Sequence, residues 1–136
     1  MTPSPTARSG LAVASTGDTI CAIGGYDADR NFLASVECLS QGAAAWVEVA
    51  SLNTARYDHG AAAVGNVIFV VGGYGTYHTN RGSVGGILRS VELTKVKRGT
   101  FNGAMASLGK FGGQNKPPRL ANGRDFAAAL EKSNNA

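Results

Sequence analysis

The sequence predicts an all-β chain made of two four-stranded antiparallel sheets, followed by a basic C-terminal tail with little strand pattern. Three observations lead to this prediction. Glycine accounts for 19 of the 136 residues, about twice its usual share, and glycine-rich chains make many tight turns. Apolar runs are short and alternate with turn-forming residues, as in strands rather than in a helical bundle. Finally, part of the chain repeats itself without a gap, which identifies the structural unit.

The repeat has a period of 48 residues in its first half. Residues 8–26, RSGLAVASTGDTICAIGGY, align with residues 56–74, RYDHGAAAVGNVIFVVGGY. The similarity resumes where Ser-Val-Glu at residues 35–37 aligns with Ser-Val-Glu at residues 90–92, now at an offset of 55. The second copy therefore carries seven extra residues after its diglycine, and we expect these residues to form a loop.

Each copy predicts four short strands separated by turn signals such as Thr16-Gly17-Asp18. The expected strands of the first copy are residues 11–14, 20–23, 36–39 and 46–49. Those of the second copy are residues 61–64, 67–71 and 91–93, with a less distinct fourth strand near Phe101. A unit of this size cannot bury both of its faces alone.

The pattern of a diglycine after the second strand, Val-Glu in the third, an aromatic residue opening the fourth and an arginine before the next copy resembles the kelch repeat. Residues 46–56, WVEVASLNTAR, are especially similar to the kelch-like substrate receptors of ubiquitin ligases. The resemblance implies a β-propeller segment with residues 8–55 and 56–110 as blades. Residues 1–7 are then a leader, and residues 111–136 a basic tail or a partial third repeat.

Several residues have expected structural roles. The diglycines should occupy turns in which a Cβ atom would be strained. A large aromatic residue at one place in both copies should fill space between neighbouring blades. The residues assigned these roles are Gly24, Gly25, Trp46, Gly72, Gly73 and Phe101.

The resemblance also implies a peptide-binding face. In kelch substrate receptors this face is formed by the arginine before the first strand, its neighbour, and the residue after the diglycine. The corresponding residues are Arg8, Ser9, Tyr26, Arg56, Tyr57 and Tyr74. Because arginine offers a planar pair of donors to carboxylates, the expected ligand is a protein or peptide, and an acidic one is favoured. The alternative is that Arg8 and Arg56 only tie neighbouring blades together.

No catalytic, metal or cofactor site is predicted. Tyr57, Asp58 and His59 are adjacent in sequence, and neighbours along a strand point apart, so they do not form a triad. His78 has no second histidine at metal-binding spacing. We therefore expect a protein-protein interaction module rather than an enzyme, with the substrate-recognition part of a ubiquitin-ligase adaptor as a specific possibility. The alternatives are a fragment of a kelch-containing enzyme, such as an oxidase or a sugar epimerase, and a truncated product without independent function.

Charge is distributed unevenly along the chain. Residues 1–93 carry a net charge of −2, whereas residues 94–136 carry +6. The basic tail lacks a nucleic-acid-binding motif, so nucleic acid is not an expected partner. Within the tail, residues 125–132 could form a short helix, or residues 124–130 could begin a third repeat. These alternatives remain open.

The sequence also suggests a location and an assembly state. No apolar run is long enough to span a membrane, and the leader lacks the apolar core of a signal peptide, so a cytoplasmic location, or alternatively a nuclear one, is expected. Cys21 and Cys38 are expected to be buried reduced thiols. Because propellers usually have four to eight blades, two blades should need further blades or self-association, and a truncated chain is the favoured explanation.

Overall fold

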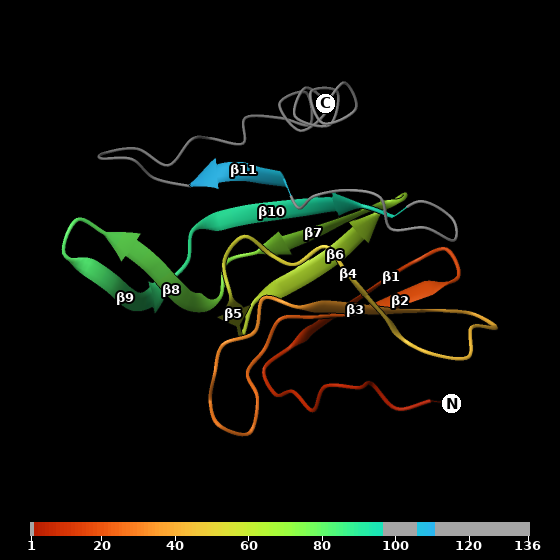
Figure 1. The fold of residues 1–136 in the computed structure, drawn as a ribbon. Helices are drawn as coiled ribbons and strands as arrows, with labels where there is room; N and C mark the ends of the chain where they lie inside the picture. Colours follow the sequence, from red (N-terminus) through yellow and green to blue (C-terminus); the bar gives the residue numbers. More distant parts are fainter. Residues whose placement is uncertain (1, 97–105, 111–136) are drawn as a thin grey trace.

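The computed structural model describes residues 2–96 and 106–110, and these residues form three antiparallel sheets without a helix (Figure 1). The first sheet, ordered β1-β2-β3-β4, contains Ala12–Thr16, Thr19–Ile23, Val36–Ser40 and Val47–Val49. The second, ordered β11-β10-β7-β6, contains Ala106–Lys110, Ser90–Lys95, Val67–Val71 and Gly60–Val64. The third, ordered β5-β8-β9, contains Arg56–Tyr57, Tyr74–Thr79 and Gly82–Ile87. No helix in the described residues is long and apolar enough to cross a membrane.

The first two sheets arise from the repeat. In both copies a glycine with positive φ, Gly17 at 57° and Gly65 at 58°, turns the first strand into the second. The strands β1 and β2 pair from Ala12 opposite Ile23 to Thr16 opposite Thr19. Alternate residues of β1 are buried and exposed, which is the pattern of a strand with one packed face. The all-β prediction and the pairing of consecutive strands are confirmed.

The fourth strand of the second sheet is β11, which pairs with β10. The sequence placed this strand near Phe101, and Phe101 itself lies outside the described residues. The two structures predicted for the tail, a helix over residues 125–132 and a partial repeat over residues 124–130, also lie outside them.

The extra residues of the second copy form a β-hairpin rather than the expected loop. Strand β8 pairs with β9 from Tyr74 opposite Ile87 to Thr79 opposite Gly82. Gly82 has a φ of 117°, which favours glycine, and the Thr79 hydroxyl donates to its carbonyl oxygen at 2.9 Å. The sequence does not predict the hairpin because the glycines at 85 and 86 lie within its second strand and interrupt the apolar alternation.

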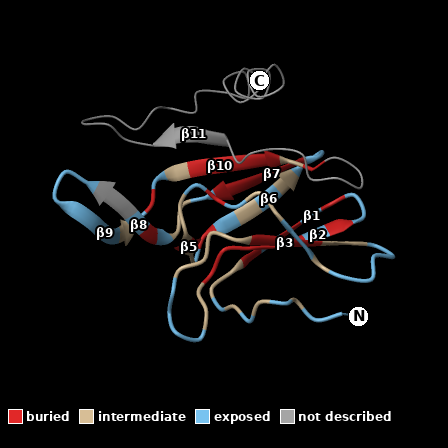
Figure 2. Ribbon diagram, viewed as in Figure 1, coloured by how far each residue is buried: buried red, intermediate tan, exposed pale blue. Residues whose placement is uncertain are grey.

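The main core lies between the first two sheets. Its buried residues include Ile23 and Val36 from the first sheet and Ile68 and Val70 from the second, and Leu52 packs among them from the connecting segment. The inner strands β1 and β6 lie against each other. A second cluster, formed by Val67, Phe69, Val91 and Leu93, occupies the opposite face of the second sheet. Figure 2 shows β7, most of β10 and part of β3 in red, and most of the exposed strand β9 in blue.

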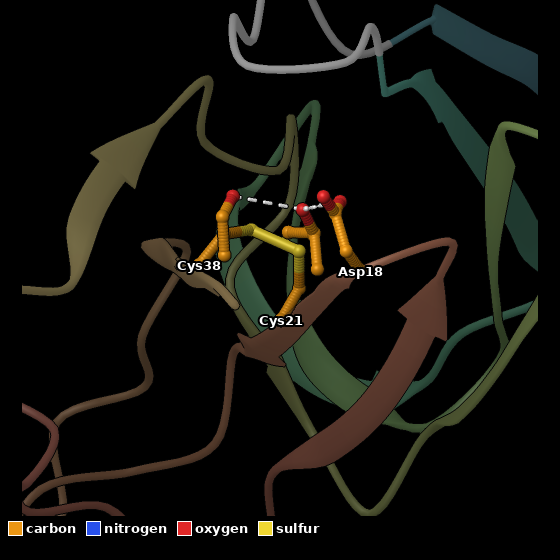
Figure 3. The surroundings of a disulfide bond; sticks show 5 residues. Asp18, Cys21 and Cys38 are labelled. Carbon is orange, nitrogen blue, oxygen red and sulfur yellow. Dashed lines mark hydrogen bonds between the residues drawn. A yellow bond between two sulfur atoms is a disulfide. The ribbon is translucent and has the colours of Figure 1, made fainter. Parts of the chain in front are cut away.

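Cys21 and Cys38 form a disulfide bond in this core, which corrects the prediction of reduced thiols. The two residues lie directly opposite each other on β2 and β3, with their Cα atoms 4.1 Å apart (Figure 3). Such a close cross-strand pair brings both side chains together on one face of the sheet. Burial was predicted correctly, but the spacing of two cysteines along the chain does not reveal that the register of neighbouring strands sets them face to face.

Trp46 does not fill the space between blades as predicted. It is half-buried just before β4, and its indole Nε1 donates to the carbonyl oxygen of Thr2 at 2.9 Å. The residue that enters the core from this part of the chain is Leu52, which is buried and donates its backbone N–H to the Ala34 carbonyl oxygen.

We expect Trp46→Ala to lower the free energy of unfolding by about 1 kcal/mol, because it removes a partly exposed ring and one hydrogen bond. A fully buried aromatic residue would cost about 3–5 kcal/mol. The chain has one tryptophan, so its emission and urea unfolding can be measured together. A strongly blue-shifted emission with a loss above about 3 kcal/mol would place Trp46 in the interior instead.

Candidate functional site

Arg56 lies on β5 of the third sheet, and its side chain is buried against the second sheet rather than exposed. Its side chain is 0% exposed and forms an ion pair with Glu92, whose Oε1 lies 2.5 Å from Nη2. The guanidinium also donates to the carbonyl oxygen of Gly72 at 2.9 Å and to the Ser90 hydroxyl at 2.8 Å. The Nη groups are therefore occupied by acceptors of the second copy.

The backbone of Arg56 is attached to the first copy. Its N–H donates to the Leu33 carbonyl oxygen at 3.2 Å, and its carbonyl oxygen accepts from the N–H of Gly25 at 2.8 Å. The Glu92 carboxylate also accepts from the backbone N–H groups of Asn53 and Thr54, at 2.6 and 3.2 Å. Arg56 thus connects the two repeats, which is the alternative role that the sequence left open.

Arg8 has the equivalent position in the first copy. Its guanidinium donates to the carbonyl oxygens of Gly24 and Ser35, at 2.9 and 3.0 Å, and pairs with Glu37 at 2.7 Å. Its side chain is almost completely buried. The structure thus buries both arginine side chains, and their Nη groups are paired with acceptors of the protein itself.

The diglycines lie at the end of the sheets where the two repeats meet. Gly24, Gly25, Gly72 and Gly73 all have positive φ, between 58° and 95°. A Cβ atom on Gly25 would lie 2.6 Å from the Ser9 carbonyl oxygen, and one on Gly73 would lie 2.6 Å from the Tyr57 carbonyl oxygen. At Gly24, Gly25 and Gly73 a backbone oxygen leaves no room for a Cβ atom, as the sequence predicted, and at Gly72 the positive φ alone favours glycine.

Three predicted contact residues come together beside these turns. The Tyr26 and Tyr57 rings meet edge to face, with centroids 5.4 Å apart, and the Tyr57 and Tyr74 centroids are 5.5 Å apart. Phe32 joins them, with centroids 4.9 Å from Tyr57 and 6.2 Å from Tyr74. Tyr74 is 37% exposed and the other three rings are partly buried. We call Tyr26, Phe32, Tyr57 and Tyr74 the aromatic cluster.

The backbone positions the cluster. Ser9, also predicted as a contact, is exposed and exchanges backbone hydrogen bonds with Tyr26 at 2.9 Å in each direction. Tyr26 also bridges to Phe32, and Tyr57 pairs with Tyr74 across β5 and β8. In Figure 1 the loop after β2 meets β5 and β8 at the end of the sheets opposite the β1-β2 turn. Phe32 was missed because its loop has no counterpart in the second copy, so the repeat gave no signal for it.

Comparison with known proteins identifies the repeat. The Kelch motif matches residues 7–53 and 55–93, which together make up more than half of the chain. The chain belongs to the Kelch motif family. Of the solved structures that match, one described as the structure of YjhT has a TM-score of 0.60 at 18% sequence identity. The match covers 79% of this chain and 34% of that chain, so this chain spans about a third of the length of that protein. No curated protein sequence matches.

The fold is therefore a kelch β-propeller segment, with the first and second sheets as adjacent blades. Kelch propellers act in general as protein-interaction modules, and the aromatic cluster lies between the two blades of this one. Among the described residues, no group of three or more His, Cys, Asp or Glu side chains is arranged to hold a metal ion.

The leader has a structural role that the sequence analysis missed. The Ser4 hydroxyl donates to Glu37 Oε2 at 2.6 Å, and the Thr6 hydroxyl donates to Glu37 Oε1. Burial raises the pKa of Glu37, but these two hydrogen bonds and the charge of Arg8 outweigh it and lower the pKa overall. Residues 6–8 and 54–56 share the sequence Thr-Ala-Arg. That identity was the available signal that the segment before Arg8 belongs to the first kelch repeat.

His59 is buried between the two kelch blades, beneath the diglycines. Its Cε1 would lie 2.8 Å from a Cβ atom on Gly24, and its own Cβ lies 2.7 Å from one on Gly73. Neither ring nitrogen makes a well-formed hydrogen bond to the described residues. Burial and the nearby charge of Arg56 lower the pKa of His59 to about 4, while the Ile23 carbonyl and Asp58 oppose this shift weakly.

This shift predicts a loss of stability in mild acid. The unfolded chain binds a proton at His59 near the ordinary pKa of 6.5, whereas the folded protein does not until about pH 4. Stability is therefore fully present above pH 6.5 and falls as the pH is lowered, by about 2 kcal/mol between about pH 7.5 and pH 5. The matched control is His59→Leu, because leucine occupies the equivalent position 11 of the first repeat. Urea unfolding should show this loss for the wild type only, and equal losses in both proteins would contradict the assignment.

Proposed function

We propose that this kelch segment binds a protein partner through the aromatic cluster, as part of a larger propeller, and acts by binding rather than by catalysis. The observation that carries the proposal is the convergence of Tyr26, Tyr57 and Tyr74. Tyr26 and Tyr74 come from corresponding places in the two repeats, both contact Tyr57, and the three rings form a partly exposed surface. Tyrosine supplies a large, rigid contact area with a polar end, and it is enriched among the residues that dominate binding energy.

A more specific form of the proposal is that the segment is the substrate-recognising part of a ubiquitin-ligase adaptor. The similarity of residues 46–56 to kelch-like substrate receptors supports this form. The blade junction is the place where a receptor would present its contact residues. Cytoplasmic location, with the nucleus as the alternative, stays a prediction.

The partner surface also requires a complete propeller. The first blade has an apolar face directed away from the second blade, on which Val13 is 59% exposed and Ile20 is 39% exposed. Exposed apolar surface of this kind favours association. We infer that further blades, on the same chain or on another copy, cover this face in the functional assembly.

Site-specific photocrosslinking in cells would test binding at the cluster. Tyr74 is replaced by p-benzoylphenylalanine in one variant, and Val64, which is 61% exposed at the opposite end of the second blade, is replaced in a matched control. We expect a partner to crosslink at position 74 and not at position 64, and Tyr57→Ala to reduce that crosslink. Equal crosslinking at both positions would contradict binding through the cluster.

The adaptor form has its own test. Depletion of the protein should lower ubiquitination of the partner crosslinked at position 74 and lengthen its lifetime. An unchanged level of ubiquitination would remove the adaptor role while leaving the binding role intact.

A further inference from the structure

The aromatic cluster presents ring faces that attract cations. A guanidinium or ammonium group over the face of a tyrosine is held by the negative face of the ring. The chain itself provides an example, because the Arg30 guanidinium carbon lies 5.6 Å from the centroid of Tyr26. Arg30 is exposed and has a φ of 65°, in the left-handed region that non-glycine residues seldom occupy. One face of the cluster is therefore already in contact with a cation.

Carboxylates border the same surface. A Cβ atom built on Gly10 would lie 2.9 Å from Asp58 Oδ1 and 3.1 Å from Tyr26 Cε1. The Asp58 carboxylate and the Tyr26 ring therefore lie close to each other, on either side of Gly10. Asp58 is exposed directly after Tyr57. Its backbone N–H donates to the Gly10 carbonyl oxygen at 2.9 Å, which fixes its place.

Two more carboxylates lie in the loop between Tyr26 and Phe32. Asp27 accepts hydrogen bonds from the backbone N–H groups of Asp29 and Asn31, at 3.0 and 2.8 Å. The hydrogen bonds from the side-chain amide and the backbone N–H of Asn31 lower the pKa of Asp27. The segments 26–32 and 57–58 thus carry three carboxylates and one guanidinium.

The arginines that had suggested an acidic ligand do not offset this charge. Arg8 and Arg56 are buried and paired with Glu37 and Glu92. Segments 26–32 and 57–58 therefore carry a net charge of −2, although the chain as a whole has a net charge of +4. We propose that the aromatic cluster binds a cationic peptide segment, with an arginine or lysine side chain over the rings and Asp27, Asp29 and Asp58 as counter-charges. This assignment rests on the proposed function and specifies its ligand.

Peptide probes of opposite charge would test the assignment. Three fluorescein-labelled Gly-Ser peptides carry three arginines, three lysines or three glutamates at the same positions, and their binding to the full chain is measured by fluorescence anisotropy. We expect the arginine peptide to bind most tightly and the lysine peptide more weakly, because guanidinium groups stack on rings. We expect no binding of the glutamate peptide. Since the overall charge of +4 would favour the glutamate peptide, nonspecific attraction predicts the opposite order.

Charge-matched variants locate the interaction. Asp58→Asn should weaken binding of the arginine peptide by about threefold to tenfold, whereas Glu48→Gln, an exposed site on β4, should leave it unchanged. Arg30→Ala should strengthen binding, since it removes the competing guanidinium. Preference for the glutamate peptide, failure of the arginine peptide to bind, or equal effects of Asp58→Asn and Glu48→Gln would overturn the cationic assignment. In contrast, the absence of any partner crosslink at position 74 in the otherwise unchanged protein would count against the proposed function itself.

Discussion

Replacing Arg56 by alanine is expected to lower the free energy of unfolding by about 3–5 kcal/mol, because it leaves a buried carboxylate without its charged partner. Glu92 is 1% exposed and would keep only its hydrogen bonds from the backbone of Asn53 and Thr54. The carbonyl oxygen of Gly72 would lose its donor as well. Such a loss is a large share of the stability of a small domain. Urea unfolding monitored by circular dichroism measures it.

Two further variants separate the charge from the geometry. Arg56→Lys keeps the charge but cannot reach Gly72, Ser90 and Glu92 together, so it should recover only part of the lost stability. Tyr57 follows Arg56 in sequence and belongs to the partly exposed aromatic cluster, so Tyr57→Leu should lower the free energy of unfolding much less than Arg56→Ala does. If Arg56→Ala weakened partner binding without lowering stability, the guanidinium would be a contact residue and the tie between repeats would be wrong.

Most of the structure that could be predicted from the sequence follows from the repeat. Strand β7 has the bounds expected from residues 67–71, and the diglycine turns follow because only glycine fits their backbone angles and close approaches. The convergence of Tyr26 and Tyr74 on Tyr57 could also be anticipated. Equivalent positions in adjacent blades lie at the same end of the fold, so a residue that recurs is brought near its counterpart.

Structural features that occur in only one copy of the repeat could not be predicted from the repeat. Phe32 and Arg30 lie in a loop of the first copy that the second copy replaces with the β8-β9 hairpin. The role of Arg8 and Arg56 was ambiguous for a different reason. An arginine with a suitable acceptor in every repeat is equally consistent with binding a ligand and with closing the repeat. The two roles are distinguished only by the structure, in which strand pairing places Glu37 beside Arg8 and Glu92 beside Arg56.

The disulfide bond should contribute about 3 kcal/mol to stability, as expected for a link between residues 17 apart. It restricts the unfolded chain between β2 and β3 and joins the two strands within the core. Adding a phosphine reductant during unfolding should therefore lower the free energy of unfolding by that amount. The oxidised chain should also be lighter than the reduced chain by two hydrogen atoms.

The second repeat provides the control for this experiment. Phe69 and Leu93 occupy the places of Cys21 and Cys38 and pair across their strands in the same way, so an apolar pair is compatible with this position of a kelch blade. The double variant Cys21→Val with Cys38→Val should fold and should show no response to the reductant.

Because disulfides are rare in the cytosol, alkylation of thiols in intact cells before lysis also tests the expected cytoplasmic location. Two alkylated thiols in the native protein, with wild-type stability unchanged by reductant, would show that the pair is reduced and that its contribution comes from packing alone.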